Sequence, residues 1–296
     1  MIPEFPQIKP LELEDRLWIH RKLKQTSREI CELSLGNIFI WKDFDHTLVT
    51  CINHNICMLI NPPNEPAYFL EPIGSNKLAE TAEILLKHAG RISRVSINFL
   101  AQLPKDRYLF EPLRNQFDYI YARANLAELK GKKYDGKRNH IKRFSRQHPN
   151  YTYQTLDPNI KEKALELFEK WFAIREESRF FPRLAYTSQK GAVIEAFSYF
   201  KELHLLGGAL FDGNKLCGFT LGSEINPELV SVHFLYGDPA LPGVTQTLLR
   251  EACRKTYTTF KYIDLEQDLG IPGLRTAKLS YHPLKMGEKF EVKPIS

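Results

Sequence analysis

The chain has 296 residues, of which 43% are hydrophobic and 26% charged, so a soluble globular protein of one large or two modest domains is expected. Its five cysteines form no C-x-x-C pair, which argues against a disulfide framework or a cysteine-based metal site and favours reduced, buried thiols. No signal peptide is visible, and no apolar run approaches the roughly 18 to 20 residues of a membrane helix. A cytoplasmic location is the expectation.

The net charge of +6 is concentrated in the basic segment from Lys130 to Arg146. Eight basic residues and one acid in this segment give +7, which leaves −1 for the rest of the chain. An anionic partner, such as phosphate, nucleic acid or an acidic lipid head group, is therefore expected to bind there. The basic residues are Lys130, Lys132, Lys133, Lys137, Arg138, Lys142, Arg143 and Arg146.

The first half of the chain has hydrophobic spacing typical of alternating helices and strands. We expect helices over Leu11–Arg28 and Leu78–His88, strands over Leu33–Trp41, Tyr68–Pro72, Arg94–Phe99 and Tyr119–Ala122, and a hairpin over Leu48–Ile60 that turns at Asn53-His54-Asn55.

The second half repeats this order. We expect helices over Lys161–Glu177, Lys190–Leu203 and Thr245–Lys255, strands over Leu229–Tyr236 and Phe260–Glu266, and a hairpin of His204–Phe211 and Leu216–Ile225 that turns at Asp212-Gly213-Asn214. The repetition predicts an α+β protein with two tandem domains, 1–128 and 151–296, joined by a basic connecting segment at 129–150. A single large α/β sheet is the competing interpretation, although the hairpins argue against a purely parallel sheet.

The stretch from residue 264 to 283 is the most strongly patterned. On an extended chain Asp264, Glu266 and Asp268 would share one face, because side chains two apart point the same way. A glycine- and proline-rich turn follows, and Arg275 and Lys278 then lie on one face of a helical turn. The pattern indicates either a bipolar functional site or a surface network of salt bridges around a turn.

The basic segment has helical spacing over Lys137–Gln147, where Arg138, Lys142 and Arg146 form one stripe. A glycine loop that leads into a helix start is a good anion site. The alternative is a solvated linker helix, although linker helices usually alternate the sign of their charges.

Other motifs are weaker. The loop Asp238–Gly243 lies between a strand and a helix, the junction at which acyl-CoA-dependent N-acyltransferases hold pyrophosphate. It offers only Gly243 as a usable glycine, so a plain connecting loop is an equal alternative. No G-x-S-x-G motif, no paired cysteine and no zinc-ligand spacing is present, and His204 and His233 are interpreted as structural.

The segments Gly131–Phe144 and Asp264–Pro283 together resemble the phosphatidylglycerol lysyltransferase C-terminal-domain family. The resemblance implies two tandem GNAT-like domains with mixed, mostly antiparallel sheets flanked by helices, similar to the Fem-type aminoacyltransferases. It implies transfer of an aminoacyl group from aminoacyl-tRNA to an amine or hydroxyl acceptor, a lipid or a peptide. Lipid-modifying members carry a multi-span membrane segment ahead of this domain, and no such segment is visible here, which argues against phosphatidylglycerol as the acceptor.

The resemblance suggests roles for individual residues. Arg275 or Lys278 would hold a phosphate or the oxyanion, and Glu266 or Asp268 would bind an ammonium group or orient the acceptor. No metal and no covalent intermediate is required. Acyl-CoA is the alternative donor, bound at Gly243, and a non-catalytic binder of nucleic acid or anions is the alternative function. The residues expected to bind substrate or anion are Lys133, Lys137, Arg138, Asn139, Lys142 and Tyr281.

Overall fold

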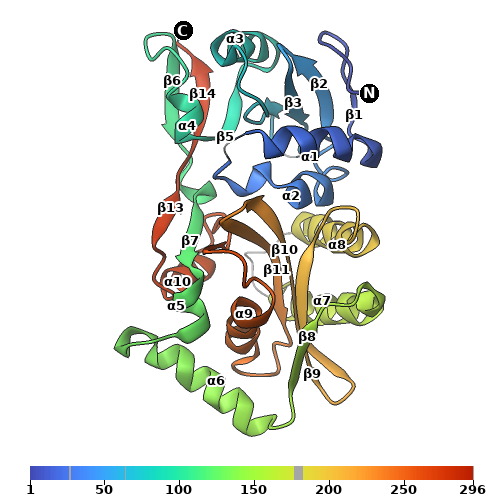
Figure 1. Cartoon of the computed structure of the whole chain (residues 1–296), viewed down its shortest axis with the longest axis vertical. Coiled ribbons are helices and arrows are strands. Elements are labelled where there is room, and N and C mark those ends of the chain that lie inside the picture. The colour runs from blue at the N-terminus through green and yellow to red at the C-terminus, as the bar shows by residue number, and fades with distance from the viewer. Residues whose placement is uncertain (27, 64, 177–182, 296) are drawn as a thin grey trace.

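The computed structural model describes residues 1–26, 28–63, 65–176 and 183–295. These residues form two seven-stranded sheets stacked along the long axis of the molecule, with helices around them (Figure 1). Five of the six strand pairings in each sheet are antiparallel and one is parallel. The predicted α+β class with mixed, mostly antiparallel sheets flanked by helices is confirmed.

The first sheet has the order β1-β2-β3-β4-β5-β14-β6. Its parallel pair is β4 and β5, and helix α3 connects these two strands. The strands are β1 (Lys9–Pro10), β2 (Leu48–Ile52), β3 (Asn55–Ile60), β4 (Tyr68–Phe69), β5 (Ile92–Ser96), β6 (Tyr108–Pro112) and β14 (Lys289–Pro294), and the helices of this half are α1 (Arg16–Lys24), α2 (Leu35–Ile40), α3 (Leu78–Ala89) and α4 (Ile97–Leu100).

The second sheet has the order β13-β7-β12-β11-β10-β9-β8, and its parallel pair is β11 and β12, connected by α9. The strands are β7 (Asp118–Ala122), β8 (Thr152–Thr155), β9 (Leu206–Asp212), β10 (Lys215–Asn226), β11 (Leu229–Gly237), β12 (Tyr262–Asp264) and β13 (Lys285–Gly287), and the helices are α5 (Arg123–Glu128), α6 (Asp135–Gln147), α7 (Lys161–Glu176), α8 (Arg183–Ser198), α9 (Val244–Lys255) and α10 (Pro272–Leu279).

The two halves exchange one strand each. Strand β7 follows β6 in the chain but pairs with β12 and β13 in the second sheet. Strand β14 follows β13 but enters the first sheet between β5 and β6. The result is a ribbon that runs past both sheets on one side of the molecule (Figure 1). The division of the chain at residues 128 and 151 stays a prediction about domains, and sheet membership crosses it at these two strands.

Several expected elements are confirmed and one is wrong. Asn53 and His54 both adopt positive φ in the β2–β3 turn, as a two-residue hairpin requires. The expected strand over Leu33–Trp41 is instead helix α2, whose N-cap Ser34 accepts a hydrogen bond from the Asn37 N–H. A short apolar run is compatible with either a buried strand or a buried helix. Here the N-cap hydrogen bond of Ser34 favours the helix.

Helix α2 lies between the two sheets (Figure 1). Its Gly36 has no room for a side chain, because an added Cβ would lie 2.5 Å from Ser223 Oγ on β10. The helix can therefore approach the second sheet closely only with glycine at this position. No helix within the described ranges is both long and apolar enough to cross a membrane.

Candidate active site

The stretch from residue 264 to 283 begins at the C-terminal end of β12, where the parallel pairing with β11 ends. The last paired residues are Ser231 and Asp264, and β11 continues to Gly237 without β12 beside it. Glu266 then takes a positive φ of 59°, which breaks the extended backbone. The prediction that Asp264, Glu266 and Asp268 share one face is therefore wrong, and the three carboxylates enter three separate networks.

Asp268 is fully buried and saturated with hydrogen bonds. Arg275 donates to both of its oxygens, at 2.8 and 2.9 Å, and Tyr119 donates at 2.6 Å. Arg114 Nη1 and the Gly270 N–H complete the set at 3.2 and 2.8 Å. Hydrogen bonds from Arg275 and Tyr119 hold the pKa of Asp268 well below its usual range despite its burial. These contacts fix the loop between β12 and α10.

Glu266 belongs to a second network, which extends to strands β11 and β10 of the second sheet. Its Oε1 accepts hydrogen bonds from Ser231 Oγ and from His233 Nδ1, both at 2.7 Å. His233 Nε2 in turn lies 2.7 Å from Ser223 Oγ. Hydrogen bonds from His233 and Ser231 lower the pKa of Glu266 despite its burial, so this carboxylate stays ionised at neutral pH.

The second carboxylate oxygen of Glu266, Oε2, has no hydrogen-bond partner among the described residues. The Glu266 side chain is 14% exposed, whereas that of His233 is 1% exposed. Glu266 thus offers one accessible, charged acceptor at the point where β11 and β12 separate. The sequence identifies Glu266, but the contribution of His233 follows only from the fold, because a single mid-strand histidine carries no signal of its own.

Lys278 does not face the carboxylates. Its ammonium donates to the carbonyl oxygens of Leu265, Glu266 and Gln267, with a shortest distance of 2.5 Å. Burial lowers its pKa, although the nearby carboxylate of Glu266 acts in the opposite direction. Lys278 therefore clamps the backbone that follows β12 and so fixes the position of Glu266.

The two segments that carry the family resemblance lie against each other. Lys137 Nζ donates to Ser280 Oγ at 2.6 Å and lies 3.9 Å from the centre of the Tyr281 ring. Tyr134 Oη donates to the carbonyl oxygen of Tyr281 at 3.2 Å. Tyr281 itself is buried, and this burial raises its pKa. The structure thus brings α6 and the stretch from 264 to 283 together.

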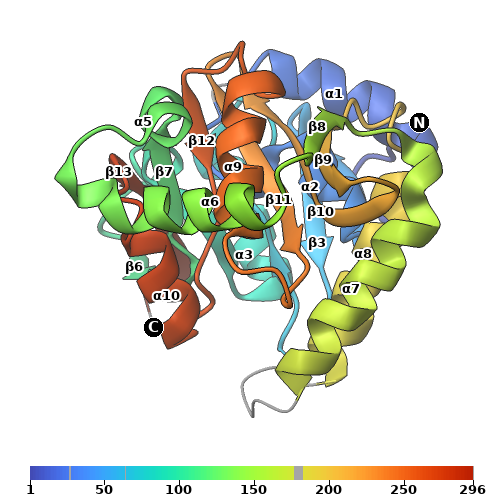
Figure 2. The ribbon, with the colours of Figure 1, turned by 90° about the horizontal axis from the view of Figure 1, so that it is seen from below.

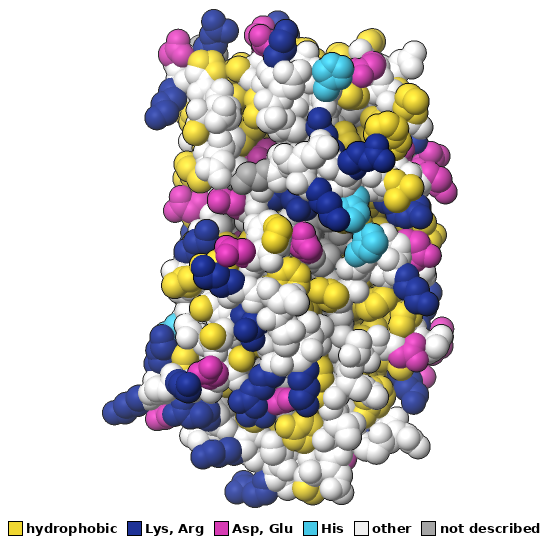
Figure 3. All heavy atoms as spheres, in the orientation of Figure 1, with side chains coloured by type: hydrophobic (Ala, Val, Ile, Leu, Met, Phe, Trp, Pro, Cys, Tyr) yellow, Lys and Arg dark blue, Asp and Glu magenta, His cyan; other side chains and the backbone are white. Residues whose placement is uncertain are grey.

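The polar and basic residues of α6 and of the turn before it divide into two groups. Arg138 is held by the carbonyl oxygens of Leu129 and Gly131 and by Asp135, so it stabilises the loop before the helix, as Lys137 stabilises the contact with Tyr281. Others point into solvent, and Lys and Arg side chains gather in the region of α6 in Figure 3. The exposed members are Lys132, Lys133, Asn139, Lys142, Arg143 and Arg146.

Gly243 is the N-cap of α9 and has a φ of 91°. An added Cβ would lie 2.1 Å from the carbonyl oxygen of His140 on α6, so glycine is required for the two helices to pack. Helix α6 crosses the start of α9 in this way (Figure 2). The Val244 N–H also donates to the carbonyl oxygen of Leu241 within the loop. The Gly243 end of the loop that would cradle CoA pyrophosphate is thus covered by α6, whereas Pro239, Ala240 and Pro242 are exposed.

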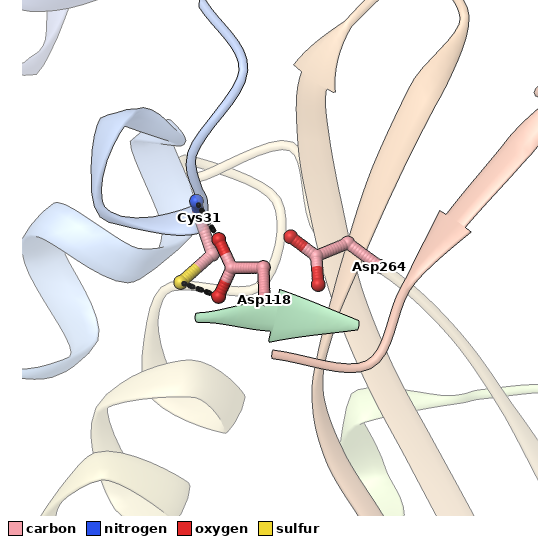
Figure 4. A group of neighbouring side chains, drawn as sticks. All are labelled: Cys31, Asp118 and Asp264. Atoms are coloured by element: carbon pink, nitrogen blue, oxygen red, sulfur yellow. Dashed lines mark hydrogen bonds between the residues drawn. The ribbon is translucent and has the colours of Figure 1, made fainter. Parts of the chain in front are cut away.

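A buried ionic cluster joins the two sheets behind this site. Lys289, at the start of β14, is fully buried, and its Nζ lies 2.6 Å from Glu32 and 2.7 Å from Asp118 at the start of β7. Cys31 donates to Asp118 from its backbone N–H and its thiol, and Asp264 faces this pair (Figure 4). The cluster therefore ties the two exchanged strands at the point where they cross between the sheets.

Cys31, Asp118 and Asp264 present three ligand-type atoms within 4.8 Å of one another. The Lys289 ammonium already lies 2.7 Å from Asp118 Oδ1 and 3.3 Å from Cys31 Sγ, so a metal ion bound by these two atoms would have to share its position. Burial raises the pKa of Asp118 to about 6 and that of Asp264 well above its ordinary value. The sequence missed this cluster, whose members are far apart in the chain.

Comparison with known proteins places this geometry in a class of transferases. The family model described as "Phosphatidylglycerol lysyltransferase, C-terminal" matches residues 23–293, so the chain belongs to this family. A conserved protein of unknown function from Bacteroides thetaiotaomicron is 30% identical, with full coverage of both chains and a TM-score of 0.88.

Two more distant structures share the fold. The structure of L-PGS from Bacillus licheniformis is 13% identical and covers 99% of this chain and 93% of its own, with a TM-score of 0.65. The C-terminal domain of a putative lysylphosphatidylglycerol synthetase from Agrobacterium fabrum is 13% identical and covers 96% and 92%, with a TM-score of 0.64. Family and fold together support a transferase of the GNAT-like aminoacyl type.

Proposed function

We propose that this protein transfers an aminoacyl group from aminoacyl-tRNA to an amine or hydroxyl acceptor at the end of β12. The observation that carries this proposal is the packing of the start of α6 against residues 280 and 281, which joins the helix with the exposed cations to the stretch of chain that carries Glu266. Such cations can hold the phosphate backbone of tRNA without reading its sequence.

Glu266 would bind an ammonium group. A carboxylate with a lowered pKa is a weak base but a good counter-charge, and its Oε2 is available for a charge-assisted hydrogen bond. The ammonium would be the α-amino group of the donor aminoacyl ester, whose carbonyl would then lie near the unpaired edge of β11. Asp268, Arg275 and Lys278 are proposed as positioning residues. Lys278 holds the backbone at Glu266, and Arg275 holds the Asp268 carboxylate, which in turn binds the Gly270 N–H in the loop after Glu266.

In the reaction, the acceptor nitrogen or oxygen attacks the ester carbonyl carbon of the aminoacyl-tRNA. A new C–N or C–O bond forms, the ester C–O bond to the tRNA ribose breaks, and the acceptor proton goes to the released ribose oxygen. No oxidant and no covalent enzyme intermediate is required. The protein would contribute orientation of the two reactants, which is a large part of the barrier reduction in such transfers.

The position of α6 favours tRNA over acyl-CoA as the donor. The start of α9, where a pyrophosphate would bind, is in contact with the His140 carbonyl oxygen, and this oxygen would repel an anion. The lipid or peptide nature of the acceptor belongs to the same proposal and needs its own screen.

The test is transfer from labelled aminoacyl-tRNAs and acyl-CoAs to a pool of amines, lipids and peptides. We expect transfer from aminoacyl-tRNA, and we expect Glu266→Gln to lower it at least a hundredfold. Glu228→Gln is the matched control, because Glu228 is 64% exposed on the turn before β11 and its side chain contacts, among the described residues, only Lys261 at 3.9 Å. Transfer at the normal rate by Glu266→Gln would refute the role of Glu266. Tight tRNA binding without transfer from any donor would favour a non-catalytic binder.

A further inference from the structure

A chain of three side chains runs through the second sheet and ends at Glu266. Ser223 Oγ on β10 lies 2.7 Å from His233 Nε2, and His233 Nδ1 lies 2.7 Å from Glu266 Oε1. An ionised carboxylate can only accept hydrogen bonds, so His233 donates to it from Nδ1. In the neutral ring, Nε2 then accepts from the Ser223 hydroxyl.

A β-bulge in β11 gives His233 its direction. Leu221 of β10 pairs with Phe234, and the next residue, Gly222, pairs with Val232. His233 lies between these pairs as the extra residue of the bulge. Val232 belongs to the apolar core that contains α9, whereas Phe234 belongs to the core that contains α2, although residues two apart in a regular strand share a face. The bulge thus lets the side chain of His233 point toward α2 and the end of β12.

Helix α2 of the first half covers this chain of side chains. A Cβ added to Gly36 would lie 2.5 Å from Ser223 Oγ and 2.8 Å from His233 Nε2. The backbone of α2 therefore approaches so closely that both groups would have to shift for any side chain at Gly36. Ser223 is 2% exposed and the side chain of His233 is 1% exposed, so α2 helps to keep water from both.

This burial excludes a hydrolytic role for the serine. The order of serine, histidine and carboxylate resembles that of serine hydrolases, in which the serine oxygen attacks the substrate. Ser223 lies buried beneath Gly36, whereas the side chain of Glu266 is 14% exposed. A substrate can therefore meet this chain of side chains at the carboxylate, and His233 acts through Glu266.

His233 fixes both the orientation and the charge of Glu266. Oε1 accepts hydrogen bonds from His233 and Ser231, which holds the carboxylate in one orientation and turns Oε2 to the ligand. The same two hydrogen bonds lower the pKa of Glu266 against the effect of burial. A charged group that is held in advance loses less freedom when a substrate ammonium binds.

We propose that His233 is a positioning residue for Glu266, and that helix α2 holds His233 in place through the close approach at Gly36. The first half of the chain thereby helps to complete the site at the end of β12. The role of His233 in transfer rests on the proposed function, whereas the arrangement of its ring and of the carboxylate can be measured without any donor.

NMR spectroscopy of the full chain tests the arrangement. Long-range ¹⁵N–¹H correlations should place a proton on Nδ1 of His233, and this proton should exchange slowly with water. Gly36→Ala should speed the exchange, because its Cβ would meet Ser223 and His233, whereas Gly191→Ala, in open space on α8, should not. A neutral ring protonated only at Nε2 would overturn the proposal, and so would unchanged exchange in a folded Gly36→Ala variant.

Two amides at position 233 separate positioning from packing. Asparagine carries its amide nitrogen near the place of Nδ1 and can still donate to Glu266, whereas glutamine carries it near the place of Nε2. The pKa of the Glu266 carboxyl, followed by ¹³C NMR, should therefore rise in His233→Gln and change less in His233→Asn. Lys278 and Asp264 also act electrostatically on this carboxyl, and both are the same in the two variants.

Transfer by the same two variants tests the role in the reaction. We expect His233→Gln to lower the rate at least tenfold and His233→Asn to retain most of it, with thermal melting as the check on folding. Equal losses in both variants would show that only packing matters and would overturn the positioning role, as would normal rates in both. If no donor supports transfer, the proposed function fails, and the NMR measurements still decide whether His233 and Gly36 hold Glu266.

Discussion

Asp268→Asn separates a structural role of this carboxylate from a chemical one. The side chain is fully buried and accepts five hydrogen bonds, three of them from arginine. Asparagine fits the space but loses the charge and presents an NH₂ group to these donors. Breaking a buried ion pair from one side costs about 3 to 5 kcal/mol. Because Arg114 is 44% exposed and Arg275 34% exposed, we expect a loss of about 3 kcal/mol.

Urea unfolding at pH 7 measures this loss as a difference in the free energy of unfolding. Asp106→Asn, a change at an exposed aspartate, is the matched control and should alter the value by less than about 0.5 kcal/mol. A loss below about 1 kcal/mol in Asp268→Asn would refute the structural account. Abolished transfer with unchanged stability would instead place Asp268 in the chemistry.

The pH dependence of this difference has a defined sign. The pKa of Asp268 is lowered in the folded state, so its stabilisation is fully present above the ordinary pKa of 3.8. It is lost as the pH falls below that value toward the folded-state pKa. The gap in stability between the natural protein and Asp268→Asn should therefore be constant from pH 7 to 5 and shrink below pH 4.

Other perturbations test the packing and the charge of the site. Gly243→Ala should lower the melting temperature, because its Cβ would meet the His140 carbonyl oxygen, whereas Gly191→Ala, in open space within α8, should leave it unchanged or raise it. Arg146→Glu should weaken tRNA binding and reduce its salt dependence by about one ion, as a filter-binding titration would measure. Lys289→Met should cost about 3 to 5 kcal/mol in urea unfolding, because two carboxylates lose their buried counter-ion.

Local sequence signals predicted most of the elements but not their partners. The turn at Asp212-Gly213-Asn214 and the spacing of Leu78–His88 depend on residues close in the chain, and both elements form as expected. Strand β7 was predicted as a strand, but nothing in its residues indicates that it pairs with β12 and not with the first sheet. Alternating apolar residues define a face, and pairing across the sheet is decided by the whole fold.

Local signals also predict which segments form the candidate site, but not how these segments are arranged in space. The composition of Gly131–Phe144 and Asp264–Pro283 identifies both segments in the sequence. Their contact through Lys137 and Tyr281 follows only from the fold. The strand alternation that was expected to align three acids ends at Asp264, since Glu266 and Leu269 adopt positive φ. Glutamate and leucine usually avoid positive φ, so the sequence does not predict this conformation at either residue. The ion pair of Lys289 with Glu32 spans 257 residues and has no local signature.

The exchanged strands set the order in which this chain can acquire its fold. Strand β14 fills the space between β5 and β6, and Val292 pairs with Phe110 although more than half of the sequence lies between them. During synthesis β5 lacks a neighbour on one side, and β6 has no partner in the first sheet, until residues 289–294 have left the ribosome. Contacts this distant in sequence also slow folding. Loss of β14 would therefore leave β5 as an edge strand and β6 without a partner in the first sheet, and a nascent first half is a natural client for chaperones.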